Sequence, residues 1–403
     1  MKPLLLSHFT VTSCIGKGLL QTLDALRQCR KTLKPCDFET VDLSTFIGEV
    51  EGVNDVKMHA GMTEYDCRNN RLAQLGLEQD GFSEAVNAAA AKYGHDRIGV
   101  FLGTSTSGIL ETELAFRHRD ITTGALPEDF IYNKTQNTYS VTDFTRQYFK
   151  LAGPAVVVSS ACSSSAKVFS VARRMIEAGL IDAAIVGGVD SLCLTTLYGF
   201  NSLGLLSTQA CRPYDITRDG ISIGEAAAFA LLERPSADID NDAILLLGIG
   251  ESSDAYHMSS PHPDGLGAKI AMQQALQSAN LDPSDIDYIN LHGTATLSND
   301  AAEAKAVSAV FKNPVPCSSS KGATGHTLGA AGAVEAVICA LALQHGLIPS
   351  GLNTQEVDAE LNLDYRLENQ QLALKHVMSN SFGFGGTNCS LIFGLAGSLG
   401  VAN

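Results

Sequence analysis

A single cysteine between an apolar run and a helix-forming stretch is the residue best placed for covalent chemistry. The run Val156-Val-Val-Ser-Ser-Ala ends at Cys162, and Ser163-Ser-Ser-Ala-Lys167 follows at once. Unpaired N–H groups and the positive end of the helix dipole at such a position favour the thiolate, which is a nucleophile. We therefore expect Cys162 to carry an acyl group covalently. The alternative is a small buried hydrophobic side chain.

Two histidines and a lysine in the second half of the chain have equally distinctive surroundings. His292 follows an apolar run at residues 288–291 and precedes a Gly-Thr pair, which places it on a loop at a sheet edge. A histidine satisfied by neighbouring backbone groups is the alternative. Lys321 and His326, separated only by small residues, open a helix-forming stretch. Burying such groups without partners is costly, so Glu303 is our candidate partner for Lys321.

A glycine-rich loop near the C-terminus completes the set. It is Asn380-Ser-Phe-Gly-Phe384-Gly-Gly-Thr-Asn388, with two phenylalanines inside a glycine string. Such a loop can swing, and it can offer backbone N–H groups to an oxyanion. A tight turn plugged by aromatic side chains is the structural alternative.

Composition excludes several classes of protein. The chain has 403 residues, 45% of them hydrophobic, and a net charge of −15 with only 28 Lys and Arg, which argues against a nucleic-acid partner. Arg68 and Arg71 form one of a few small basic clusters, for which solvated helix faces are the plainer interpretation. Ten cysteines without a CxxC spacing indicate reduced thiols and a cytoplasmic location. No segment approaches the ~18 uninterrupted apolar residues of a membrane span.

Apolar strand-like runs alternate with helix-length segments, which is typical of an α/β protein with sheets covered by helices. The polar stretch 234–242 separates two sets of runs and predicts two halves, 1–240 and 241–403. In each half a strand leads into a long helix, at 163–180 and at 328–345; the second helix is rich in Gly and Ala and is expected to be central and buried. The predicted strands are 98–102, 155–159, 183–186, 229–232, 244–249, 288–291, 376–379 and 390–393, with a further strand near residues 1–14.

The chain resembles the elongating β-ketoacyl-acyl-carrier-protein synthases of the thiolase fold over nearly its whole length. The matching strings are Ser160-Ala-Cys162-Ser-Ser-Ser, Gly187-Gly-Val-Asp-Ser191, Arg212-Pro-Tyr-Asp-Ile-Thr-Arg-Asp-Gly220, Ser252-Ser-Asp-Ala-Tyr-His257, and the strings around His292, Lys321 to His326, and Phe382 to Asn388. The resemblance implies two similar βαβαβαββ halves stacked as five layers, α-β-α-β-α, and usually a dimer.

The resemblance also implies a role for each residue of the set. Cys162 is the expected nucleophile, His292 and His326 the histidine pair, Lys321 with Glu303 a supporting ion pair, and Phe384 the gate. The implied reaction is decarboxylative Claisen condensation of an acyl group on Cys162 with a malonyl thioester. The oxyanion is expected between the backbone N–H groups of Cys162 and Phe384. The residues expected to contact substrate are Thr104, Gly108, Phe200, Thr294, Thr296 and Phe382.

The partner implied by the resemblance is an acyl carrier protein, which brings its own phosphopantetheine, so no metal or free cofactor is expected. Arg68 and Arg71 are the candidate docking residues on this chain. Gly204 stands where related enzymes often have an arginine that touches the carrier, and Ala226 replaces a usual glycine. These departures suggest a specialised pathway, such as polyene or polyketide assembly, or a heterodimer whose partner supplies part of the docking surface. A homodimer or a heterodimer with a related ketosynthase or chain-length-factor subunit, in fatty acid or in polyene or polyketide synthesis, stays open.

Two other functions remain open from the residues. A non-catalytic chain-length-determining subunit resembles these enzymes but lacks the nucleophilic cysteine, and Cys162 is present here. A thiolase acting on coenzyme A esters needs a second reactive cysteine, for which Cys389 is the candidate.

Overall fold

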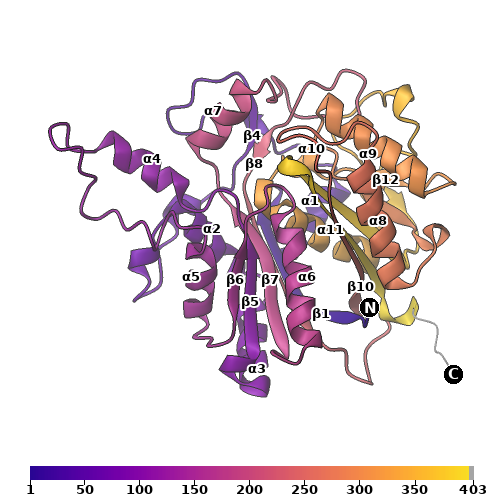
Figure 1. The fold of residues 1–403 in the computed structure, drawn as a ribbon, viewed down its shortest axis with the longest axis horizontal. Helices are drawn as coiled ribbons and strands as arrows, with labels where there is room; N and C mark the ends of the chain where they lie inside the picture. The colour runs from indigo at the N-terminus through magenta and orange to yellow at the C-terminus, as the bar shows by residue number, and fades with distance from the viewer. Residues whose placement is uncertain (399–403) are drawn as a thin grey trace.

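The computed structural model describes residues 1–398 and has one large sheet (Figure 1). Its eleven strands are two halves of five strands each and the short strand β2 (Gly16–Lys17), which pairs with β1. The first half has the strand order β6-β5-β7-β9-β1, and the second half has the order β12-β11-β15-β16-β10. The halves meet where β1 and β10 pair antiparallel, with Leu4 opposite Leu246. Their strands are β1 Leu4–Ser13, β5 Ile98–Gly103, β6 Ala155–Val158, β7 Ala183–Asp190 and β9 Ala226–Glu233, then β10 Ile244–Ser253, β11 Tyr288–Asn290, β12 Cys317–Ser318, β15 His376–Gly383 and β16 Thr387–Leu395.

Strand direction follows the same plan in both halves. The two strands farthest from the junction run parallel to their neighbours, as in β5 with β6 and β11 with β12. The strands nearest the junction pair antiparallel, as in β1 with β9 and β10 with β16. All eight strands predicted from apolar runs are present. Several are longer than predicted, because glycines and alanines at their ends are recruited by pairing with neighbouring strands.

Helices form three layers around the two half-sheets. α6 (Ser164–Glu177) and α11 (Ala331–His345) pack on each other and contact strands of both halves. On the outside, one group covers the first half and another covers the second half (Figure 1). The outer helices are α2 Arg68–Leu77, α3 Phe82–Tyr93 and α5 Ser140–Tyr148, then α8 Leu266–Ala279 and α9 Leu297–Val310. The α-β-α-β-α stacking expected from the resemblance is therefore confirmed.

Small side chains bring the two central helices together. A Cβ added at Gly332 of α11 comes within 2.6 Å of the Ala166 backbone nitrogen of α6, so only glycine fits there. Most of α11 is buried in a core shared by both halves, which confirms the prediction that this helix is central. Among the described residues, Leu328–His345 is one stretch long and apolar enough to cross a membrane, but 89% of it is buried inside the fold.

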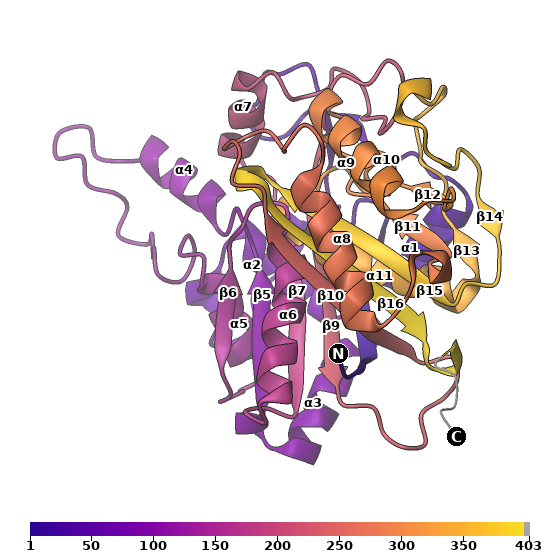
Figure 2. The same ribbon diagram turned by 45° about the vertical axis from the view of Figure 1, so that its right-hand side comes forward.

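The link between β9 and β10 contains the predicted boundary, but the halves share a core across it. The division into 1–240 and 241–403 thus stays an interpretation. The remaining helices and strands are outside the two half-sheets and their main covering helices, and α4 with the segment after it extends away from the rest of the fold (Figure 2). They are α1 Leu19–Arg27, α4 Ile109–Arg117, α7 Leu194–Ser202 and α10 Lys321–Thr324, with the short strands β2 Gly16–Lys17, β3 Lys34–Pro35, β4 Phe46–Gly48, β8 Ile223–Gly224, β13 Leu347–Ile348 and β14 Gln370–Gln371.

Candidate active site

Cys162 lies in the tight turn between β6 and α6. Ala161 has a φ of 51°, in the left-handed region that disfavours a side chain, so the backbone is strained immediately before the thiol. The Ser164 hydroxyl donates to the Ala161 carbonyl at 2.6 Å and accepts from the Ser160 N–H at 2.8 Å, which holds the turn in place. The thiol is directed away from α6 into an enclosed space, where Cys162 is only 6% exposed.

The resting protonation state of Cys162 differs from the sequence-based expectation. Burial raises the pKa of its thiol to about 11, although the positive charge of Lys321 and the backbone N–H of Phe384 both act to lower it. The expectation that the helix end favours thiolate is therefore wrong for the resting protein, because removing the thiolate from water outweighs that stabilisation. The nucleophile requires a base.

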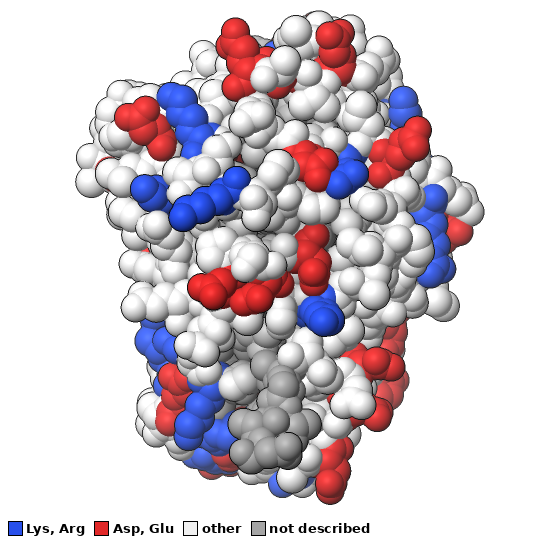
Figure 3. Space-filling model, turned by 90° about the vertical axis from the view of Figure 1, so that its right-hand side faces the viewer, with Lys and Arg blue, Asp and Glu red and all other residues white. Residues whose placement is uncertain are grey.

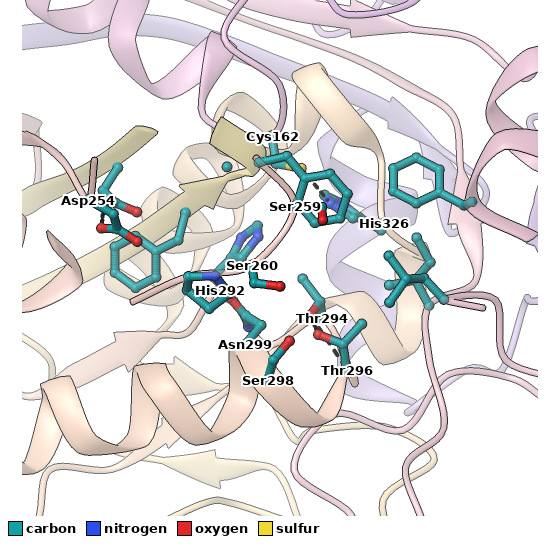
Figure 4. A pocket seen from close by; sticks show the side chains of 18 residues that line it. Cys162, Asp254, Ser259, Ser260, His292, Thr294, Thr296, Ser298, Asn299 and His326 are labelled. Atoms are coloured by element: carbon teal, nitrogen blue, oxygen red, sulfur yellow. Dashed lines mark hydrogen bonds between the residues drawn. The ribbon is translucent and has the colours of Figure 1, made fainter. Parts of the chain in front are cut away.

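His326 is that base by position. Its Nε2 lies 3.0 Å from the Cys162 Sγ, and the His292 ring stands nearly perpendicular to the His326 ring at 5.4 Å between centroids. One ligand atom from each of Cys162, His292 and His326 lies within 4.8 Å of the others, so all three can act on one substrate (Figure 4). Burial and the charge of Lys321 hold the pKa of both imidazoles well below the usual range, so both are neutral near pH 7.

Lys321 is paired with a different carboxylate from the one predicted. Its Nζ lies 3.3 Å from the His292 Nδ1 and forms a buried salt bridge with Glu335 in α11. The prediction of a Lys321–Glu303 ion pair is wrong. Burial raises the pKa of Glu335 to about 7, against the lowering effect of Lys321. In the sequence, Glu335 could have been identified as the single polar side chain in the otherwise apolar stretch 331–343.

Glu303 instead fixes the loop that carries His292. Its carboxylate accepts the backbone N–H groups of His292 and Gly293, both at 2.8 Å, and the Tyr214 hydroxyl at 2.8 Å. The Asn380 amide donates to it at 3.2 Å. Four neutral donors thus replace the expected cation, and Glu303 positions the imidazole by holding its backbone.

The Phe384 loop closes the space over the thiol. Gly385 and Gly386 have φ values of 81° and 73°, which the sharp turn of the loop requires. The Phe384 ring packs on the Phe200 ring, with centroids 5.6 Å apart. The cavity beside Cys162 has a volume of about 40 Å³, which is room for roughly three water molecules. This volume is too small for an acyl chain, and the role of Phe384 as a gate stays a prediction.

Four of the six residues predicted to contact substrate line this cavity, namely Phe200, Thr294, Thr296 and Phe382. Thr104 and Gly108 do not line it, and their contact with substrate stays a prediction. The Thr104 hydroxyl is fully buried and donates to Asp190 at 2.7 Å, and Gly108 packs against the backbone of Thr135. Sequence reasoning missed a group of small polar residues at the cavity mouth, which are Ser259, Ser260, Ser298 and Asn299 (Figure 4).

Arg68 is not a surface residue, which corrects its prediction as a docking residue. It is 3% exposed and its guanidinium donates to Glu225, Glu49 and Asn54. Arg68 begins α2, which packs on the sheet and turns this side chain inward. Arg71 is partly exposed but donates to Asp66 at 2.5 Å. On the face seen in Figure 3, Lys and Arg are interspersed with Asp and Glu.

The raised pKa of Cys162 predicts how alkylation depends on pH. Because the folded thiol ionises at about 11, the thiolate fraction at pH 8 is about one in a thousand and increases about tenfold per pH unit. We expect the rate constant for iodoacetamide modification of Cys162 to rise up to at least about pH 9 without a plateau. Peptide mass spectrometry after timed alkylation measures this rate. A plateau below pH 8 would indicate a resting thiolate–imidazolium pair.

Comparisons with known proteins agree with this geometry. The family model described as "Beta-ketoacyl synthase, N-terminal domain" matches residues 71–237, and "Beta-ketoacyl synthase, C-terminal domain" matches residues 244–355. A 3-oxoacyl-[acyl-carrier-protein] synthase 2 from Vibrio cholerae is 33% identical over 387 residues, covering 88% of this chain and 90% of that protein. A mitochondrial 3-oxoacyl-[acyl-carrier-protein] synthase from Arabidopsis thaliana is 40% identical over 262 residues. That alignment spans 60% of this chain and 56% of the relative, little more than half its length.

Solved structures with the same fold include two at 30% identity or more. A chain from the complex of the ketosynthase ApeO with its chain length factor ApeC, from Xenorhabdus doucetiae, matches with a TM-score of 0.89 at 37% identity. The match covers 98% of this chain and 98% of that chain. A β-ketoacyl synthase from Burkholderia phymatum matches with a TM-score of 0.86 at 30% identity, covering 98% of this chain and 100% of that one. Both matches extend over essentially the whole chain, so the thiolase-like arrangement of the two halves is shared with these ketosynthases.

Proposed function

The chain belongs to the β-ketoacyl synthase family, and from that premise we propose that it catalyses decarboxylative condensation of a Cys162-bound acyl group with malonyl-carrier protein. The observation that carries the proposal is the Cys162 thiol, 3.0 Å from the His326 Nε2 and within reach of the His292 ring. A nucleophile, a base and two neutral N–H donors then share one nearly closed chamber.

In the first half-reaction, an acyl group moves from the carrier to Cys162. His326 takes the thiol proton as the sulfur attacks the thioester carbonyl, and the resulting oxyanion accepts backbone N–H groups of Cys162 and Phe384. The Phe384 N–H lies close enough to lower the pKa of the thiol. The attack itself forms the bond between the Cys162 sulfur and the acyl carbon. Collapse of this intermediate restores the carbonyl and breaks the bond to the pantetheine sulfur, which leaves with the proton held by His326.

In the second half-reaction, the malonyl carboxylate leaves as CO2 and its bonding electrons form an enolate. The neutral His292 and His326 rings donate N–H bonds to the enolate oxygen as its charge develops. The enolate carbon attacks the acyl-Cys162 carbonyl and forms the new carbon–carbon bond, and the Cys162 sulfur departs as a thiolate. The thiolate then takes up one proton from the medium, which is the proton that the net reaction consumes. Lys321 supports His292 through its Nδ1, and Glu335 keeps the buried ammonium paired.

Partners and context follow the same proposal. The carrier supplies phosphopantetheine, so the chain requires no free cofactor. We propose a cytoplasmic enzyme that assembles with a second copy or with a related subunit, since one structurally similar ketosynthase is bound to a chain length factor. Fatty acid elongation and assembly of polyene or polyketide chains are the pathways in which this chemistry operates.

The two other functions fit the site less well. A non-catalytic chain-length-determining subunit has no use for a thiol held against an unprotonated imidazole. A thiolase needs a second cysteine at the reacting centre, whereas Cys389 is fully buried within β16 and does not line the cavity.

The deciding experiment measures acylation of the protein itself. We expect incubation with an acyl-carrier thioester to add one acyl group, seen by intact-mass spectrometry and mapped by peptide analysis to Cys162. Addition of malonyl-carrier should then discharge the adduct and release the β-ketoacyl product. Absence of any adduct with short, medium and long acyl groups would instead favour the non-catalytic subunit.

A further inference from the structure

The mouth of the Cys162 cavity is formed by segments without charged side chains. Four of the segments that contribute lining residues contain no Lys, Arg, Asp or Glu; they are 195–204, 255–263, 294–299 and 382–388. The charged residue among the lining side chains is Asp254, whose carboxylate accepts the Asn388 amide at 2.7 Å and the His262 N–H at 2.9 Å. The Asp254 carboxylate is therefore already hydrogen-bonded within these loops. Its charge has the same sign as the net charge of the chain, which is −15.

Large apolar side chains on these segments are exposed to solvent. We call them the apolar rim. Met258 is 80% exposed, Leu297 63% and Leu203 55%, and each is close in sequence to cavity-lining residues. The other two members are Tyr256 and Tyr198.

Contacts between the segments place the rim around one opening. The Met258 carbonyl accepts the Gly385 N–H at 2.8 Å, which joins the rim to the Phe384 loop. The Phe384 ring packs on Phe200 in α7, the helix that carries Tyr198 and is followed directly by Leu203. Leu297 begins α9, directly after the lining residue Thr296. The rim thus surrounds the route to the thiol.

We propose that the carrier protein docks on the apolar rim through apolar contacts rather than through ion pairs. This inference rests on the proposed function, since a carrier-tethered acyl group reaches Cys162 only if the carrier sits against this mouth. The fitting partner surface has exposed aliphatic side chains beside its phosphopantetheine. Cations that could bind an acidic carrier are missing from the mouth segments, and the candidate residues Arg68 and Arg71 already pair with carboxylates. Apolar burial is the remaining source of affinity.

The test compares carrier-bound substrates with small thioesters that lack the carrier. Met258→Glu and Leu203→Glu place a charge on the rim at exposed positions, where folding is not at risk. We expect each to lower kcat/KM for malonyl-carrier by about tenfold or more. With malonyl-N-acetylcysteamine and an N-acetylcysteamine acyl donor, kcat/KM should stay within about twofold of the unsubstituted protein, since this substrate makes no contact with the rim. Leu180→Glu is the matched control, because Leu180 is 56% exposed and lies after α6, away from the mouth segments.

Ionic strength supplies an independent readout. For the unsubstituted protein, KM for malonyl-carrier should change by less than about threefold between about 0.05 and 0.5 M NaCl, because salt screens ion pairs but not apolar contacts. A KM that rises tenfold with salt, or rim variants that behave like Leu180→Glu, would overturn the docking inference. Turnover of small thioesters in either case would leave the proposed function intact, whereas no turnover of any thioester would count against that function instead.

Discussion

Replacing Cys162 by alanine is expected to abolish condensation while leaving malonyl decarboxylation measurable. Among the described residues, no other thiol lines the cavity, and the serine and threonine hydroxyls there are much weaker nucleophiles, so product formation should fall by about four orders of magnitude or more. His292 and His326 remain in place, and both are neutral donors for the enolate oxygen. We therefore expect Cys162→Ala to release CO2 from malonyl-carrier without forming a carbon–carbon bond. Product mass spectrometry and 14CO2 release measure the two activities separately.

The matched control for this prediction is Cys389→Ala. Cys389 is fully buried within β16 and burial raises the pKa of its thiol far above the usual range, so it is not reactive. Its removal should leave both condensation and the acyl adduct intact. A Cys389→Ala variant that loses condensation but keeps acyl-Cys162 would revive the thiolase interpretation. Condensation that survives in Cys162→Ala at a tenth of the original rate would contradict the proposed mechanism.

The strands could be predicted because a strand that is buried on both faces consists almost entirely of apolar and small residues. Strand β7 is buried along its whole length, and it appears as an unbroken run of apolar and small residues. The glycines in β7 also have a local cause, since a Cβ at Gly188 would lie 2.5 Å from the Ser165 Cβ of α6. The five-layer stacking, by contrast, was predicted from the resemblance, and the order of the strands was not predicted, because pairing between distant strands is not visible in local patterns.

The site residues that could be predicted are those of a chemically distinctive type that lie where one secondary-structure element ends or the next begins. Cys162, His292 and His326 each lie where a strand ends or a helix begins, and such positions converge at one edge of a sheet. Choosing between carboxylates was not possible in this way. Glu335 lies in α11 and Glu303 in α9, and sequence spacing does not determine which of these helices brings its carboxylate to Lys321.

Two errors in the site have one physical cause, which is that a residue's type does not reveal its burial. The helix-end argument for a Cys162 thiolate omitted the desolvation that raises its pKa. The docking role for Arg68 assumed an exposed guanidinium, whereas this one lies inside the fold against Glu225. In each case the charge was assessed as if in water, and the structure places it out of water.

Removing one member of the Lys321–Glu335 pair should be the most destabilising single change in the site. Both side chains are at most 2% exposed, so Glu335→Gln leaves a buried ammonium without its counterion. We expect the free energy of unfolding to fall by about 3–5 kcal/mol. The double variant Lys321→Met with Glu335→Gln should recover part of that loss, since it leaves no unpaired charge. Urea denaturation monitored by circular dichroism gives these free energies.

A second thermodynamic cycle distinguishes the two carboxylates. For Lys321→Met combined with Glu335→Gln, we expect a coupling energy of at least about 1 kcal/mol. For Lys321→Met combined with Glu303→Gln, the coupling energy should be smaller. Glu303 accepts four neutral donors and has no ion pair to lose. All variants that contain Lys321→Met should also lose condensation, because the His292 Nδ1 loses its partner at 3.3 Å. A larger coupling to Glu303 would mean that the predicted ion pair, and not the Glu335 pair, is the one that stabilises the protein.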